Sequence, residues 1–317
     1  MTIIREPTQL PTDRPFTRTE ARDHGMTDRR LAQAVKAGEL RRPLRGVFVS
    51  ARLPDTIDLR VACLALVMPE GCFVADHTAG WLFCGDAILP PNAHLEVPKP
   101  AIFRPSDAGR LRNPLSRSGE RAVRPEDLCT VGGIVSTTMI RTAWDLGRLQ
   151  QRDVALAGMD QLMRAGGFAL DELCAGVKRF DRERGVVQLR VLAPRVDGGA
   201  ESFGESALRN RWYDAGLVRP QTQIPIMVGD REVYRLDIGD PDRRYAAEYR
   251  GVDFHTEEDA AADDDRQEWV ESQRGYIIDN FVRENVFGPR TNADVVLRRR
   301  WDEAGASLAR RSRLPLS

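Results

Sequence analysis

The stretch "YRLDIGDPDRRYAAEYRG", residues 234–251, predicts two short strands joined by a polar turn. In the first strand, alternation directs Leu236 and Ile238 to one face and Asp237 to the other. The flanking sequence extends this hairpin to the order helix, three-strand meander, helix, strand. The expected elements are a helix at 201–216, strands at 222–228, 232–238 and 244–250, a helix at 256–274 and a strand at 275–279.

Two acids of this hairpin are candidate metal ligands. If the two strands pair, the carboxylates of Asp237 and Glu248 converge, and carboxylate oxygens are the ligands that Mg²⁺ prefers. A third acid from the preceding helix, Glu205 (or Glu201), would complete the site. The alternative is a solvent-facing hairpin whose acids pair with Arg235 and Arg243. Spacing alone leaves both interpretations open.

The N-terminal part of the chain has the signals of two short helices. Thr17 with Glu20 three residues later forms a capping box, and Gly25 ends the first helix. Thr27 caps a second helix that ends before Gly38. The segment "ELRRPLRGVFV" then predicts a small basic hairpin. A helix pair followed by a hairpin is the outline of a winged helix-turn-helix.

This segment is the candidate interface with double-stranded DNA. Arginine can grip phosphate or bind guanine, and glutamine can bind adenine, which favours a role for the exposed side of the second helix. The hairpin arginines would lie over the DNA backbone. The candidate residues are Arg29, Arg30, Gln33 and Lys36 in the helix and Arg41, Arg42 and Arg45 in the wing. The alternative is a solvated basic helix pair without a role in DNA binding.

The central region predicts a mixed α/β scaffold. Helices are expected at 56–68, 75–83, 137–146 and 153–166, with strands at 93–98 and 133–138. His77 and His94 have no cysteine nearby, which favours a structural role over metal binding.

Composition describes a globular protein that is expected to be cytoplasmic. The chain has 317 residues, of which 42% are hydrophobic and 30% charged, enough for two or three domains. No apolar run reaches the ~20 residues of a membrane span, and no signal peptide is expected. The five cysteines form no C-x-x-C pair, which disfavours a zinc ribbon or a disulfide framework.

Charge is distributed unevenly although the net charge is zero. Residues 15–50 hold eight basic and four acidic side chains, whereas residues 201–270 hold nine basic and seventeen acidic ones. The C-terminal residues around 298–311 are basic again. A basic head and tail around an acidic body favour a nucleic-acid partner.

A series of short motifs follows in a fixed order along the chain: "ADHTAGWLF", "VSTTMIRTAWDL", "ESFGESALR", "YRLDIG", "AAEYRG", "FH", "DDDR" and "RGYIID". In these motifs the chain resembles actinobacterial proteins that join an AbiEi-antitoxin-like winged helix to a domain of the PD-(D/E)XK endonuclease fold, in its very-short-patch-repair-like branch. The resemblance runs from about residue 15 to 287.

The resemblance implies roles for the acidic hairpin. Asp237 and Glu248 would carry Mg²⁺, and residue 250 would be the lysine that activates water. This sequence has Arg250 there, where close relatives often have aspartate, and arginine does not give up its proton near neutral pH. Arg250 can still clamp a phosphate. His255 is then the candidate general acid or base, with a structural role as its alternative.

The predicted protein is therefore a mixed α/β (α+β) multidomain chain. Its expected segments are a disordered lead (1–14), a winged helix-turn-helix (15–52), a mixed α/β middle domain (53–195), a PD-(D/E)XK-like domain (196–288) and a basic C-terminal helix or tail (289–317). Two functions are favoured: a DNA-binding Mg²⁺-dependent endonuclease with Glu205, Asp237, Glu248, Arg250 and His255 in its site, and an AbiEi-type repressor or antitoxin without cleavage. A third, a structural or interaction role for the acidic domain in contacting another protein, has no specific sequence feature in its favour. The second function would add a cognate toxin as partner.

Overall fold

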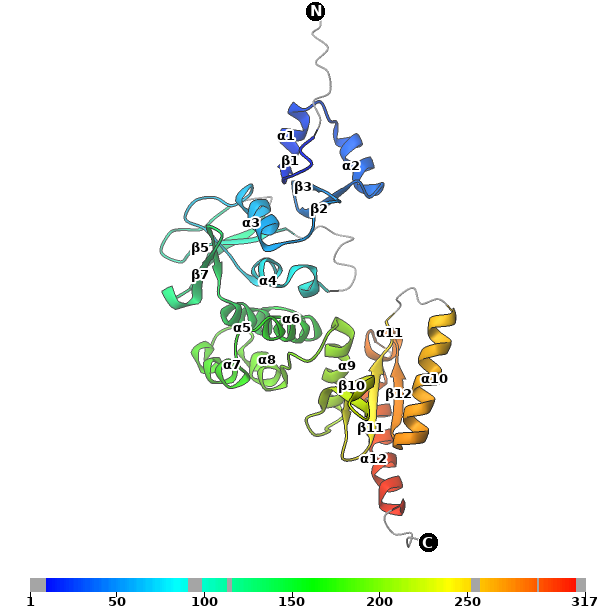
Figure 1. The fold of residues 1–317 in the computed structure, drawn as a ribbon. Coiled ribbons are helices and arrows are strands. Elements are labelled where there is room, and N and C mark those ends of the chain that lie inside the picture. The colour runs from blue at the N-terminus through cyan, green and yellow to red at the C-terminus, as the bar shows by residue number, and fades with distance from the viewer. Residues whose placement is uncertain (1–9, 91–98, 113–115, 252–256, 290, 312–317) are drawn as a thin grey trace, which may run out of the picture. The chain divides into compact units, whose positions relative to one another are not determined.

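The computed structural model describes residues 10–90, 99–112, 116–251, 257–289 and 291–311, with the side chains of 257–264 and 311 left out. Within this part of the chain, helices and three sheets make up a mixed α/β multidomain protein, as predicted (Figure 1). Contacts divide the chain into two compact units. The first comprises Met1–Leu149 with Ala165–Phe168, and the second Gln150–Arg164 with Ala169–Ser317.

The first unit begins with a small helical and stranded segment. Its elements are β1 (Phe16–Thr17), α1 (Arg18–Asp23), α2 (Asp28–Lys36), β2 (Leu40–Leu44) and β3 (Val47–Ser50). The strands form an antiparallel sheet of order β1-β3-β2. The hydroxyls of Thr17 and Thr27 accept the backbone N–H groups of Glu20 and Arg30. These N-caps confirm both predicted helix starts.

An apolar cluster holds this segment together. Phe16, Leu31 and Phe48 are buried in it, and Leu10 packs against it from the segment that was predicted to be a disordered lead. The β2–β3 pairing shifts register between Arg41 and Leu44. This interval contains a proline, which has no N–H to donate to a ladder.

The rest of the first unit is built on a five-stranded mixed sheet of order β6-β5-β4-β8-β7. Its elements are α3 (Ile57–Ala65), β4 (Phe73–Val74), α4 (Asp76–Cys84), β5 (Ala101–Pro105), β6 (Arg117–Arg121), β7 (Leu128–Val131), β8 (Ile134–Thr137) and α5 (Met139–Leu149). Helices α3, α4 and α5 and strand β8 match predicted elements. The strand predicted at 93–98 lies outside the described residues.

A buried ion network joins α4 and α5 to this sheet. The carboxylates of Asp76 and Asp145, both fully buried, accept hydrogen bonds from the guanidinium of Arg121. Asp145 also accepts from Arg141 at 3.0 Å. Burial lowers the pKa of His77. His94 lies outside the described residues.

The second unit carries a four-stranded sheet of order β12-β11-β10-β9. Its elements are α6 (Arg152–Arg164), α7 (Leu170–Gly176), α8 (Val186–Leu192), α9 (Phe203–Asp214), β9 (Gln221–Val228), β10 (Arg231–Asp240), β11 (Tyr245–Tyr249), α10 (Glu257–Arg274), β12 (Ile277–Phe281), α11 (Arg283–Val286) and α12 (Ala293–Arg311). Strands β9, β10 and β11 are antiparallel neighbours, whereas β12 runs parallel to β11. The predicted order helix, three-strand meander, helix, strand is confirmed.

Helices cover both faces of this sheet. Leu208 of α9 and Leu297 of α12 are buried against Tyr245 of β11 on one face. Val270 of α10 is buried against Ile278 of β12 on the other (Figure 1). Helix α12, which the sequence predicted as a basic helix or tail, is thus part of the core. Each described helix is too short or too polar to cross a membrane.

Residues 150–164 join the second unit because buried polar groups tie α6 to α9. The carboxylate of Asp160, with no exposed surface, forms an ion pair with the equally buried guanidinium of Arg209. It also accepts the Ser206 hydroxyl at 2.7 Å and the Asp197 backbone N–H at 2.9 Å. Helix α6 thus belongs to the second compact unit.

Candidate functional site

The candidate site lies where β10 and β11 separate. Their paired register ends at Ile238 and Ala247. Beyond it, the carboxylate Oδ2 of Asp237, rather than a backbone carbonyl, accepts the N–H of Tyr249 at 2.9 Å. A side chain thus satisfies a backbone donor at the end of the ladder, and this fixes the carboxylate between the two strands.

Leu236 and Ile238, on either side of Asp237 in β10, point to opposite faces of the sheet, whereas strict alternation predicts a single face. Leu236 packs in the cluster with α10, whereas Ile238 packs in the cluster with α9 and α12. On the neighbouring strand, Gln223 has a left-handed backbone with φ of 51°. Gln223 lies between the partners of Leu236 and Ile238, so both strands depart from a regular pleat at the same place.

Glu205 approaches the site from the first turn of α9. Ser202 caps this helix by accepting the N–H of Glu205 at 3.1 Å. The Oε2 atom of Glu205 accepts the backbone N–H of Glu201 at 2.9 Å and the side-chain amide of Gln223 at 3.0 Å. Burial raises the pKa of Glu205, and these donors partly offset the effect.

A glycine lets α9 come close to β11. A Cβ built on Gly204 would lie 2.0 Å from the ring of Tyr249. Any other residue here would push the helix away, and the carboxylate of Glu205 with it.

Glu248 reaches the same region from β11. It is buried, with 8% of its surface exposed, and its Oε2 atom accepts the hydroxyl of Tyr234 at 2.9 Å. The sequence did not single out Tyr234, because a tyrosine in a strand is usually a core residue.

The carboxylates interact electrostatically. Burial raises the pKa of Asp237, and the negative charges of Glu205 and Glu248 raise it further, to about 8, against the opposing effect of the Tyr249 N–H. Glu201 contributes in the same direction. The structure therefore brings the predicted acids Glu205, Asp237 and Glu248 together.

The two hairpin arginines that the alternative interpretation pairs with these acids have other partners. Arg235 forms its ion pair with Glu232 at 2.7 Å. Arg243 lies over the ring of Trp301, 3.4 Å from its centre, and 3.9 Å from Asp240.

Arg250 extends toward α10. Its Nη2 atom donates to the side-chain oxygen of Gln267 at 3.1 Å, and that oxygen also accepts the amide of Asn280 at 2.7 Å. His255 lies outside the described residues.

The donor chemistry of the cluster fits a hard divalent cation, since carboxylate oxygens carry it and their mutual repulsion would be relieved by a positive ion. Among the residues that the structure describes, however, no group of three or more His, Cys, Asp or Glu side chains is arranged to hold a metal ion.

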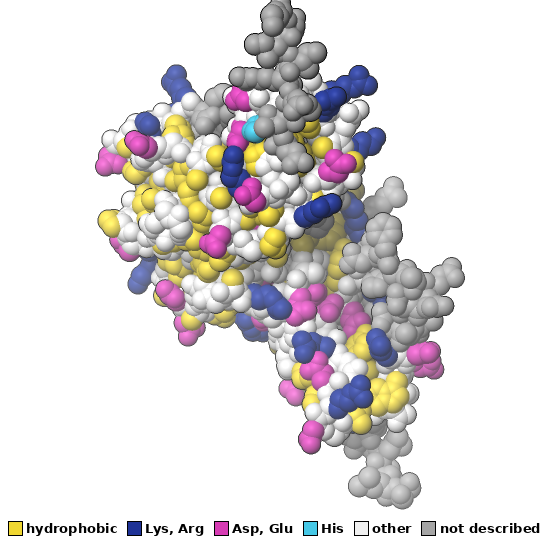
Figure 2. Space-filling model, turned by 45° about the horizontal axis from the view of Figure 1, so that its top comes forward, with side chains coloured by type: hydrophobic (Ala, Val, Ile, Leu, Met, Phe, Trp, Pro, Cys, Tyr) yellow, Lys and Arg dark blue, Asp and Glu magenta, His cyan; other side chains and the backbone are white. Residues whose placement is uncertain are grey.

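The basic N-terminal candidates differ in accessibility. Arg29, Arg30, Gln33 and Lys36 are all exposed on α2. The capped start of α2 fixes their helical spacing. Figure 2 shows Lys and Arg side chains interspersed with Asp and Glu over the face that it draws.

The hairpin arginines are partly engaged within the segment. Arg41 donates to the backbone carbonyl of Leu53, and the guanidinium of Arg42 lies 5.7 Å from the ring centre of Phe48. Burial lowers the pKa of Arg42, as do the positive charges of Arg18 and Arg45. Arg45 is exposed at the turn. Arg18 joins this basic group, although the sequence indicated it only as part of a helix start.

Comparison with known proteins identifies two relatives of this chain. Two curated proteins of Mycobacterium tuberculosis, from strains CDC 1551 and H37Rv, are each 33% identical over 230 residues, which cover 73% of this chain and 80% of the relative. The chain belongs to their family. Both relatives carry the description "uncharacterized protein". No solved structure matches the chain.

The N-terminal segment of the chain also resembles a described protein family. A family model described as "Transcriptional regulator, AbiEi antitoxin" matches residues 13–51. This range contains the capped helix pair and the hairpin. The AbiEi part of the predicted resemblance is therefore confirmed, whereas the PD-(D/E)XK part stays a prediction.

Proposed function

We propose that this protein is a DNA-binding transcriptional regulator of the AbiEi antitoxin type. The observation that carries the proposal is the exposed basic surface of α2, in a segment that matches the AbiEi regulator model over residues 13–51. In this proposal residues 15–52 act as a winged helix-turn-helix. Helix α2 enters the major groove of duplex DNA, and Arg45 and Arg18 contact its backbone. A cognate toxin is the proposed protein partner, as the antitoxin description implies.

Two arginines of α2 test this role. Arg29→Ala and Arg30→Ala should each weaken binding of a selected duplex about tenfold or more and reduce its salt dependence, because each removes a phosphate or base contact. The measurement is a gel-shift titration at several salt concentrations. The matched control is Arg190→Ala, which removes an exposed arginine from α8. Equal weakening in the control and the α2 variants would contradict the proposal.

A second candidate function is Mg²⁺-dependent cleavage of DNA by the acid cluster. The observation that favours it is the group of Glu205, Asp237 and Glu248, in which the pKa of Asp237 is raised to about 8. Asp237 and Glu248 would hold the ion, which when bound polarises a phosphate and lowers the pKa of water. Arg250 would bind phosphate rather than accept a proton.

Plasmid cleavage decides between the two candidates. If the second is correct, purified protein should nick supercoiled DNA with Mg²⁺ or Mn²⁺ but not with EDTA. Asp237→Ala and Glu248→Ala should each reduce the rate at least about 100-fold. Asp230→Ala, in the exposed turn between β9 and β10, serves as the control. Absence of cleavage with either metal, alongside an intact gel shift, would reject the endonuclease and leave the regulator.

A further inference from the structure

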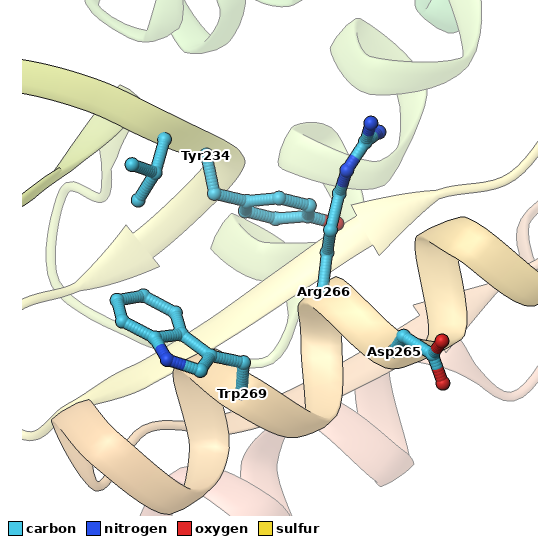
Figure 3. A pocket seen from close by; sticks show the side chains of 5 residues that line it. Tyr234, Asp265, Arg266 and Trp269 are labelled. Carbon is cyan, nitrogen blue, oxygen red and sulfur yellow. The ribbon is translucent and has the colours of Figure 1, made fainter.

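A pocket of about 270 Å³ opens between β10 and α10. Val233 and Tyr234 line it from β10, and Asp265, Arg266 and Trp269 line it from α10. Figure 3 shows the rings of Trp269 and Tyr234 on two sides of the space, with Arg266 beside the hydroxyl end of Tyr234. The carboxylate of Asp265 is turned away from both rings.

The side chains that line this pocket are at least partly exposed to solvent, but the helix that carries Trp269 is fixed on the sheet. Trp269 and Val233 are each 37% exposed, so both present apolar surface to solvent. The neighbouring Val270 is fully buried and anchors α10 on the sheet. The guanidinium of Arg274 lies 5.6 Å from the ring centre of Trp269. The buried Val270 and the contact with Arg274 thus hold the exposed apolar surface of α10 in place.

One side chain connects the pocket to the acid cluster. The ring of Tyr234 lines the pocket, and its hydroxyl donates to Glu248 at 2.9 Å. The carboxylates therefore lie one tyrosine side chain away from the apolar space. The exposed Arg266 adds a positive charge at the rim. The aromatic walls fit the flat face of a nucleobase, and the cation at the mouth can pair with its phosphate.

We propose that this pocket is a subsite for one unpaired nucleobase of a DNA strand, stacked against Trp269 and Tyr234 with its phosphate beside Arg266. The inference rests on the proposed binding of DNA and extends it to the second unit. Stacking on aromatic side chains accepts any base, because every base has a flat π-face. A base held here brings its phosphodiester toward the carboxylates beyond Tyr234.

A short single strand containing 2-aminopurine tests the subsite directly. The probe is a pentanucleotide of thymidines with 2-aminopurine at its centre, whose fluorescence falls when the base stacks. The intact protein should quench the probe, and Trp269→Ala should weaken its binding about tenfold or more. Trp269→Phe keeps an aromatic face and should retain most of the binding. Val187→Ala, at a residue of α8 that is 70% exposed, should have no effect.

Several outcomes would overturn the subsite. They are absence of quenching by the intact protein, equal affinity in Trp269→Ala, or Trp269-dependent binding of a short apolar peptide without binding of the oligonucleotide. The duplex gel shift with the α2 variants is a separate readout. A gel shift without quenching rejects the subsite alone, whereas quenching without a gel shift rejects the regulator alone.

Discussion

Replacing Asp160 by alanine should lower the free energy of unfolding of the second unit by about 3–5 kcal/mol. Asp160 and Arg209 have no exposed surface, and their ion pair joins α6 to α9. Burial alone would lower the pKa of Arg209, but the charge of Asp160 raises it above its ordinary value. Removing the carboxylate leaves a buried cation without its counter-charge, together with the donors of Ser206 and Asp197.

Two further variants distinguish the cost of leaving a buried charge unpaired from the cost of shortening any charged side chain. Asp181→Ala removes an exposed partner of Arg190 and should change stability by no more than about 1 kcal/mol. The double change Asp160→Leu with Arg209→Met should recover much of the loss, because apolar residues of similar volume need no counter-charge. Urea unfolding gives the free energies. Hydrogen exchange of α9 amides assigns them to this unit, since two units need not unfold in one step. A loss below about 1 kcal/mol in Asp160→Ala would contradict the prediction.

The same ion pair shows which kind of contact a sequence pattern does not indicate. Local signals identify elements well: the N-caps Thr17 and Thr27 and the three strands of the meander are where the sequence predicts them. The contact between Asp160 and Arg209 spans 49 residues. No local pattern indicates a pairing at that distance, because an aspartate and an arginine on two helices look like surface residues until their partners are known.

The sequence predicted only those parts of the candidate site that depend on residue type and spacing. Residue type and spacing indicated Asp237 and Glu248, and strand pairing brings them to the same end of the ladder. The hydrogen bond of Tyr234 to Glu248 and the position of Gln223 depend on a distorted strand pair. A period of two assumes regular strands, so it assigned Leu236 and Ile238 to one face when they pack on opposite faces.

The raised pKa of Asp237 predicts how stability changes with pH. Its folded value of about 8 lies above the ordinary value of 3.8, so the native state holds a proton that the unfolded chain releases. This contribution to stability is complete below about pH 4 and is lost as pH rises toward 8. Asp237→Asn lacks the ionisation but keeps an oxygen for the Tyr249 N–H. The variant should therefore gain stability relative to the parent protein between pH 5 and pH 9, by on the order of 4 kcal/mol.

Urea unfolding of both proteins at a series of pH values measures this gap, and Asp230→Asn is the control from an exposed turn. A gap that stays constant or narrows as pH rises would show that the pKa of Asp237 is not raised in the folded protein. Added Mg²⁺ extends the test. If the cluster binds the ion, Mg²⁺ at pH 9 should stabilise the parent protein and close the gap, because the cation replaces the lost proton as counter-charge. If the gap opens with pH but ignores Mg²⁺, the cluster holds a proton rather than a metal, and the endonuclease loses its proposed ion.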